Sequence, residues 1–254
     1  MARVVTLATL RTRALQRANL GTASNGAIIQ NGQPGQASEL TDCINEGIAE
    51  LHDLILSQED QPLYLESVTF NTASSTDTYR IGAGQAIPVT DFYRAKGVDI
   101  QFGQNIVRSA YPFTWAERNR YKYLGGWVYT QPVSYRLIGK GSDQSQAQFD
   151  SIKLMPQPSG QFTCTLWYNP TATRLTNLSD TLDGVDGFEE HVVLTAAIKL
   201  LMKQEQFEHA QALQAERGRQ EARILAMIPT RDAENPPRVQ DVLLNDGWLG
   251  RPYY

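Results

Sequence analysis

The 254-residue sequence has only two cysteines and no apolar run long enough to cross a membrane. Two cysteines cannot form the disulfide framework of a small secreted protein, so Cys43 and Cys164 are expected to be reduced, partly buried thiols. The longest apolar run, residues 192–202, is roughly half a membrane span and contains Lys199. We therefore expect no transmembrane segment and no membrane partner.

The chain also lacks an excess of positive charge. It has 23 Lys and Arg residues against 27 Asp and Glu residues, which gives a net charge of −4. A protein that coats nucleic acid needs a cationic surplus on one face, so the composition excludes that class. It does not exclude a protein that DNA merely passes.

Motifs that carry catalysis or hold a metal are missing as well. The sequence has no nucleophile elbow, no P-loop and no dinucleotide fingerprint. Its three histidines lack metal-ligand spacing, and the acidic run 180–187 lacks the alternating acids and closing Glu of a calcium loop. We expect no enzymatic activity, no metal and no cofactor.

Hydrophobic periodicity divides the chain into four zones and predicts an α+β protein. Residues 1–60 show two helical stripes, separated by a Gly/Asn/Gln-rich loop at 21–37. Residues 61–175 are rich in short strand-like runs, and residues 176–228 are helical again. We predict a helical bundle built from both ends of the chain, a β-rich insertion, and an extended C-terminal tail at 229–254.

Within the β-rich zone the pattern predicts a set of short strands. They cover residues 65–70, 78–81, 98–102, 133–138, 151–155 and 161–167. The last two read as a hairpin with its turn at Pro156–Gly160, and Thr114 can cap a short helix that ends near Tyr123. The many aromatic residues of this zone are either its own core or a platform for sugars or bases.

The first two predicted helices carry opposite charges. One has arginines and no acid, and the other has acids and no Lys or Arg. Their charged residues include Arg11, Arg13, Arg17, Asp42, Glu46 and Glu50. Acids four residues apart repel along a helix, so this row is best tolerated beside positive charge. The acidic row is either solvated, paired with the first helix in an antiparallel hairpin, or in contact with the first helix of a neighbouring subunit.

One longer segment has a recognisable pattern, LWYNPTATRLTNLSDTLDGVDGFEEHVVLTAAIKLLMKQE at residues 166–205. An aromatic-Pro strand end leads through an acidic, Gly-containing turn to a helix that opens with Phe-Glu-Glu. Its main residues are Trp167, Tyr168, Pro170, Asp183, Gly184, Gly187, Phe188, Glu189 and Glu190. The segment resembles the head-to-tail adaptor, connector or neck proteins of tailed bacteriophages. The β-rich zone is similar to the insertion of the tail-tubular-A-like adaptors.

The resemblance implies a structural virion protein in the phage neck, made in the host bacterial cytoplasm. Such proteins form a homo-oligomeric ring, usually of about twelve copies, below the portal protein. The ring extends the DNA channel, so that double-stranded DNA passes without specific binding during ejection. It also offers an attachment surface to the tail or nozzle protein.

The tail of the chain ends on exposed-type aromatic and apolar residues. They are Trp248, Leu249, Tyr253 and Tyr254, and Arg251 lies among them as a fifth candidate docking residue. Such a tail either docks on the portal or another partner, or folds back on its own chain. Two other functions stay open, another phage tail component (a tube, terminator or baseplate protein) and a glycan-binding module that uses the aromatic β zone.

Overall fold

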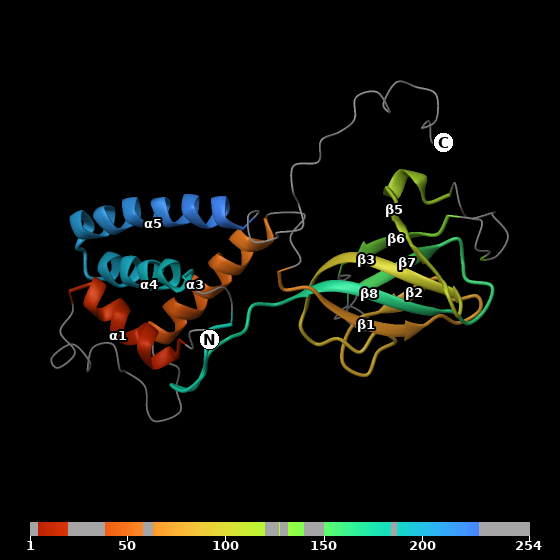
Figure 1. Ribbon diagram of the computed structural model, residues 1–254, viewed down its shortest axis with the longest axis horizontal. Helices are drawn as coiled ribbons and strands as arrows, with labels where there is room; N and C mark the ends of the chain where they lie inside the picture. The colour runs from red at the N-terminus through yellow and green to blue at the C-terminus, as the bar shows by residue number, and fades with distance from the viewer. Residues whose placement is uncertain are drawn as a thin grey trace, which may run out of the picture. The chain divides into compact units, whose positions relative to one another are not determined.

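The structure is a computed structural model (Figure 1). It describes residues 5–19, 39–57, 63–119, 127, 132–139, 150–183 and 187–228. The loop at 21–37 and the tail at 229–254 lie outside these ranges. The described residues form four α-helices and two four-stranded sheets, so the predicted α+β class is confirmed.

The chain divides into two compact units. One, the helical unit, comprises residues 1–61 and 173–254, and the other, the β unit, comprises residues 62–172. Every described α-helix belongs to the helical unit and every described strand to the β unit.

The helical unit is organised around its third described helix. Its helices are α1 (Leu7–Arg17), α3 (Glu39–Leu56), α4 (Glu189–Lys203) and α5 (Phe207–Met227). Helix α4 contacts each of the other three, and residues on all its sides are buried, from Val192 to Leu201. The broad apolar stripe of this segment explains that position, because a helix that is apolar nearly all round must be covered on all sides.

Helices α3 and α4 approach each other closely at Gly47. A Cβ atom placed on Gly47 would lie 3.2 Å from the Val192 carbonyl oxygen and 3.3 Å from Thr195 Cβ. Such distances are shorter than ordinary van der Waals contact, so even a Cβ atom at this crossing would require its neighbours to move by a few tenths of an ångström.

Helix α5 packs on the unit by a narrow seam. Ala210 and Ile224 are its buried residues, followed by Ile228 just beyond its end. Phe207, the first residue of the helix, is 59% exposed. A left-handed turn at Glu205 (φ 60°) separates α4 from α5, and the buried seam of α5 begins at Ala210.

The β unit contains two sheets that share one apolar core. The first has the order β1 (Glu66–Asn71), β8 (Thr163–Pro170), β3 (Phe92–Gly103), β4 (Ile106–Ser109). The second has the order β2 (Thr78–Arg80), β7 (Ser151–Met155), β6 (Ser134–Ile138), β5 (Tyr111–Pro112). All pairs are antiparallel except β5–β6. Inward residues of both sheets, such as Ile100, Ile152 and Leu166, join one buried cluster.

The predicted hairpin of residues 151–170 does not form, because β7 and β8 belong to different sheets. Both edges of β7 pair with β2 and β6, and both edges of β8 pair with β1 and β3. The intervening residues therefore cross between the sheets instead of turning within one. The Thr72 hydroxyl holds this crossing, since it donates to the Gly160 carbonyl (3.0 Å) and accepts from the Phe162 N–H (2.9 Å).

Three further details of the β zone differ from the prediction. Strand β3 begins at Phe92, and the short strands β4 and β5 were not predicted. The helix expected after Thr114 is a 3-10 turn at Trp115–Glu117. The Glu117 carboxylate accepts from the Thr114 N–H (3.1 Å) and hydroxyl (2.9 Å), which fixes the start of that turn.

Candidate functional site

The adaptor-like segment begins with the aromatic pair on β8. Trp167 Nε1 donates to Asp99 Oδ2 on β3 (2.7 Å), and the Tyr168 hydroxyl donates to Glu66 Oε2 on β1 (3.0 Å). Tyr168 is buried, and burial followed by the Glu66 carboxylate raises the pKa of its phenol. Pro170, the last residue of β8, pairs with Phe92. The aromatic pair thus binds β8 to both neighbouring strands.

The next part of the segment is clamped by helix α3. Leu175 is 2% exposed, and its backbone is bracketed by the side chain of Asn45. The Leu175 N–H donates to Asn45 Oδ1 (2.8 Å), and Asn45 Nδ2 donates to the Leu175 carbonyl (3.0 Å). One amide side chain therefore satisfies both backbone groups of a buried residue.

Asp180 organises a turn, and backbone carbonyls of this turn cap the start of helix α1. Its Oδ2 accepts from the N–H groups of Asn177 (2.7 Å) and Thr176 (2.8 Å), and these bonds lower the pKa of the carboxyl. The carbonyls of Asp180 and Leu178 then accept from the Leu7 N–H (2.9 Å) and the Ala8 N–H (3.1 Å). These N–H groups have no partner inside α1, so the turn completes the start of that helix.

The segment ends by starting helix α4. Gly187 has φ 96°, a left-handed conformation that favours glycine, and Phe188 is 2% exposed. Glu189 and Glu190 occupy the first turn, as predicted, and Glu189 Oε2 accepts from the Gly187 N–H (2.7 Å). Acidic side chains at this position interact favourably with the helix dipole and stabilise the helix. Asp183 precedes this turn, and Gly184 lies outside the described residues.

The arginines of α1 pair with acids of α4 and α5. Arg13 Nη1 lies 3.7 Å from Glu189 Oε1, and Arg17 Nη2 lies 2.5 Å from Glu190 Oε1. Arg17 Nη1 also lies 3.6 Å from Glu216 Oε1. Arg11 is half-buried on the same helix.

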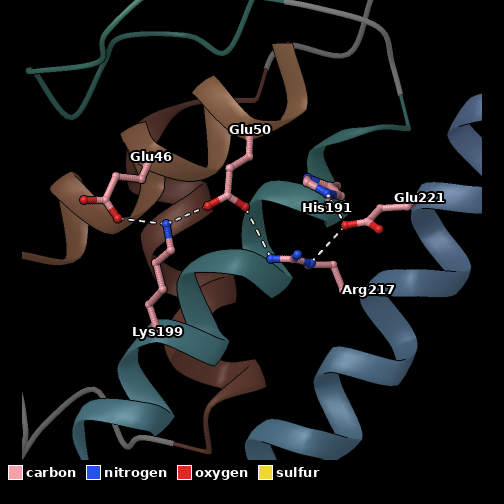
Figure 2. A network of polar contacts seen from close by, with 6 residues as sticks. All are labelled: Glu46, Glu50, His191, Lys199, Arg217 and Glu221. Carbon is pink, nitrogen blue, oxygen red and sulfur yellow. Dashed lines mark hydrogen bonds and ion pairs between the residues drawn. The ribbon is translucent and has the colours of Figure 1, made fainter. Parts of the chain in front are cut away.

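The acidic row of α3 pairs with cations from the opposite end of α4 and from α5. Lys199 Nζ donates to Glu46 Oε2 and to Glu50 Oε1, both at 2.8 Å (Figure 2). Arg217 Nη1 reaches Glu50 Oε2 at 3.3 Å, and Lys203 pairs with Glu39. Burial opposes the charge on Lys199, but the bonds to Glu46 and Glu50 outweigh it and raise its pKa. At the far end of the row, Arg174 Nη2 lies 2.8 Å from Asp42 Oδ1.

Of the three alternatives left open for the acidic row, pairing with the first helix of the same chain is not the one seen among the described residues, because the partners of both helices come mainly from α4 and α5. Helix α4 contacts both α1 and α3 and supplies the opposite charge to each. Its first turn gives acids to α1, and its second half gives lysines to α3. The inter-subunit role of Arg11, Arg13, Arg17, Asp42, Glu46 and Glu50 stays a prediction.

Sequence reasoning missed the continuation of this network. Arg217 Nε lies 3.0 Å from Glu221 Oε1 within α5, and the same oxygen lies 3.3 Å from His191 Nε2 on α4 (Figure 2). His191 is 2% exposed, and burial lowers its pKa although Glu221 opposes that effect. The i,i+4 spacing of Arg217 and Glu221 was the available signal.

Other candidate groups have structural surroundings. Cys164 is buried and Cys43 is half-buried, and both are free thiols as expected. Among the residues that the structure describes, no cluster of three or more His, Cys, Asp or Glu side chains could hold a metal ion. None of the helices in the described ranges is long and apolar enough to cross a lipid bilayer. The predicted docking residues Trp248, Leu249, Arg251, Tyr253 and Tyr254 lie outside those ranges.

Comparison with protein families gives a match over nearly the whole chain. Residues 5–240 match the family model described as SU10 adaptor protein, which spans both the helical unit and the β unit. A search of curated proteins gives no match. The chain thus belongs to the SU10 adaptor protein family, which confirms its resemblance to bacteriophage head-to-tail adaptors.

Proposed function

We propose that this phage adaptor protein acts in the virion neck as a homo-oligomeric ring of about twelve copies. In this proposal the ring sits below the portal protein, extends the DNA channel and presents an attachment surface to the tail or nozzle protein. The observation that carries the proposal is the family match over residues 5–240.

The geometry of the adaptor-like segment supports a structural role without catalysis. Its side chains are used to hold the fold, since Leu175 and Phe188 are buried and Asp180 organises the turn that caps α1. The carboxylates of Asp180 and Glu189, which in a catalytic site could face a substrate, accept hydrogen bonds from backbone N–H groups instead. We therefore propose assembly, and not an enzymatic reaction, as the whole function of the protein.

The partners follow from the same proposal. The tail at 229–254 docks on the portal or the next neck protein through Trp248, Leu249, Arg251, Tyr253 and Tyr254. Double-stranded DNA passes the ring without sequence-specific binding, in keeping with the net charge of −4. The protein is made in the host cytoplasm and then becomes part of the virion.

Electron microscopy of the purified chain, alone and mixed with the portal protein of the same genome, tests the proposal. A ring stacked on the portal is the expected result and would give the copy number. Polymerisation into tubes without any portal complex would instead identify a tail component. Binding to a glycan array without a portal complex would identify the β unit as a sugar-binding module.

Deletion of residues 247–254 tests the docking tail. The deleted chain is expected to keep the unfolding transitions of the full chain and to lose portal binding. Loss of solubility or of cooperative unfolding would show instead that the tail folds back on its own chain. Replacing only Arg231 by Ala, in the same tail but outside the docking residues, is the matched control and should leave portal binding intact.

A further inference from the structure

The β unit carries a small basic surface around one exposed indole. We call Trp115, Arg118 and Arg136 the Trp115 cluster. Trp115 is 48% exposed, and the Cζ atoms of Arg118 and Arg136 lie 5.6 Å and 5.9 Å from the centre of its ring. Two cations thus share one aromatic side chain at the surface next to β5 and β6.

The two arginines are oriented but not neutralised. Arg118 Nη1 donates to the Trp115 carbonyl (3.0 Å), and Arg136 Nη1 donates to the Phe113 carbonyl (3.1 Å). Within the described ranges neither guanidinium forms an ion pair with a carboxylate. Trp and Arg together are the residue types that most often dominate protein–protein interfaces. The Trp115 cluster therefore has the charge and the residue types to bind an acidic protein surface.

The two units of the chain have opposite net charges. The β unit has 10 Lys and Arg residues against 7 Asp and Glu residues, a net charge of +3. The helical unit has 13 against 20, a net charge of −7. The acidic helical unit of a second copy of this chain is therefore a candidate partner for the basic Trp115 cluster.

The acidic row of α3, defined as Asp42, Glu46 and Glu50, is the most concentrated part of that surface. The side chains of Asp42 and Glu46 remain 45% and 61% exposed although each has a cation nearby. Arg217, which pairs with Glu50, also pairs with Glu221. The three carboxylates of the row and Glu221 therefore have three cations beside them, Arg174, Lys199 and Arg217. Exposed ion pairs are weak and exchange easily, so a further cation can join this row.

We propose that the Trp115 cluster of one copy docks on the acidic row of α3 of a neighbouring copy. The two surfaces differ, so the contact is heterologous and passes from copy to copy, which is the kind of interface that closes into a ring. This inference rests on the proposed ring and names its subunit contact. DNA is the less suitable occupant, because two cations are few for phosphate binding and the −7 unit repels it.

Charge reversal on each surface of the full-length chain tests the contact. Arg118→Glu and Glu46→Lys change one exposed residue on each side, and Arg80→Glu on β2 is the matched control. Strand β2 is the edge of its sheet opposite to β5, so Arg80 lies away from the cluster. Association is measured by sedimentation at low and high salt, and circular dichroism confirms that each variant is folded.

The wild type is expected to self-associate, more strongly at low salt. Arg118→Glu and Glu46→Lys should each weaken association about tenfold or more, and Arg80→Glu should not. A 1:1 mixture of the two weakened variants should recover association, because each then meets an opposite charge on its neighbour. Recovery in the mixture is an outcome that a merely unstable variant cannot produce.

Several outcomes would overturn the proposal. These are a wild type that stays monomeric at high concentration, an Arg118→Glu variant that associates normally, or a mixture that fails to recover. Loss of binding to a short DNA duplex in Arg118→Glu, with association unchanged, would assign the cluster to nucleic acid instead. A portal-bound ring that persists in Arg118→Glu would refute this contact and leave the adaptor function intact. Salt-sensitive, charge-rescued association without any portal complex would support the contact and refute the adaptor function.

Discussion

Replacement of Asn45 by Ala is expected to destabilise the helical unit selectively. Asn45 lies on α3 and makes two hydrogen bonds to the backbone of Leu175, at 2.8 Å and 3.0 Å. Leu175 belongs to the segment that caps α1 and leads into α4. The substitution therefore removes a link between α3 and a segment far away in sequence, and it leaves the helix propensity of α3 no worse.

The size of the destabilisation depends on the Leu175 N–H and carbonyl, which lose their hydrogen-bond partner in the variant. Leu175 is 2% exposed, so water reaches its N–H and carbonyl poorly after the substitution. A buried polar group that loses its partner costs about 1–3 kcal/mol. Two such groups, with partial relaxation of the segment, give an expected loss of about 2–4 kcal/mol in the free energy of unfolding of the helical unit.

Two spectroscopic probes can separate this unit from the β unit in one denaturation experiment. All described α-helices lie in the helical unit, so far-UV circular dichroism reports mainly on it. Three of the four tryptophans, Trp115, Trp127 and Trp167, lie in the β unit, so tryptophan fluorescence reports mainly on that unit. The Asn45→Ala variant should shift the dichroism transition to lower urea and leave the fluorescence transition in place.

Gln211→Ala, at an exposed position on α5, is the matched control and should change the unfolding free energy by less than about 0.5 kcal/mol. A change for Asn45→Ala as small as that of the control would refute the clamp. An equal shift of both transitions would show that the two units unfold together, and the selective argument would fail.

Three more predictions concern packing, pH and thiol chemistry. Gly47→Leu should cost about 1–3 kcal/mol because Val192 and Thr195 occupy the space, while Gly218→Leu, with no atom near its Cβ position, should stabilise α5 in the same thermal melts. Burial lowers the pKa of His191 below its ordinary 6.5, so on acidification the unfolded chain takes up a proton at this residue before the folded chain does. The contribution of neutral His191 to the stability of the helical unit should therefore be complete above pH 6.5 and be lost as the pH falls through the lowered pKa. His191→Gln should flatten that decline in urea titrations. Burial raises the pKa of Cys164 to about 12, so a thiol reagent should label only Cys43 in the native chain, slowly, and Cys43→Ser should abolish native labelling.

Local periodicity was sufficient to predict which parts of the chain are helical. The zone predicted to be helical at residues 176–228 contains the buried helix α4 and the surface helix α5, which packs by a narrow seam. Both outcomes depend on which faces of one helix are apolar, and that information is contained in a single segment.

Strand pairing could not be predicted in the same way. Residues 151–155 and 161–167 have the lengths, the spacing and the turn residues of a hairpin, yet each strand pairs with others far away in sequence. Local turn chemistry is compatible both with a tight turn and with a crossing between sheets. Whether these residues form a hairpin or a crossing depends on which strand edges are already paired with other strands. The sequence of one segment does not contain that information.

The charge pairs of the helical unit could have been predicted by joining two features that were read separately. Helix α4 is apolar over most of its surface, and it contacts each of the other three helices described in the unit. It is also acidic at its start, with Glu189 and Glu190, and basic toward its end, with Lys199 and Lys203. A central helix with charged ends of opposite sign must meet the arginines of α1 with one end and the acids of α3 with the other. Because those pairs lie at the rim of the unit and stay partly exposed, they satisfy the single chain and still leave its acidic row within reach of a second copy.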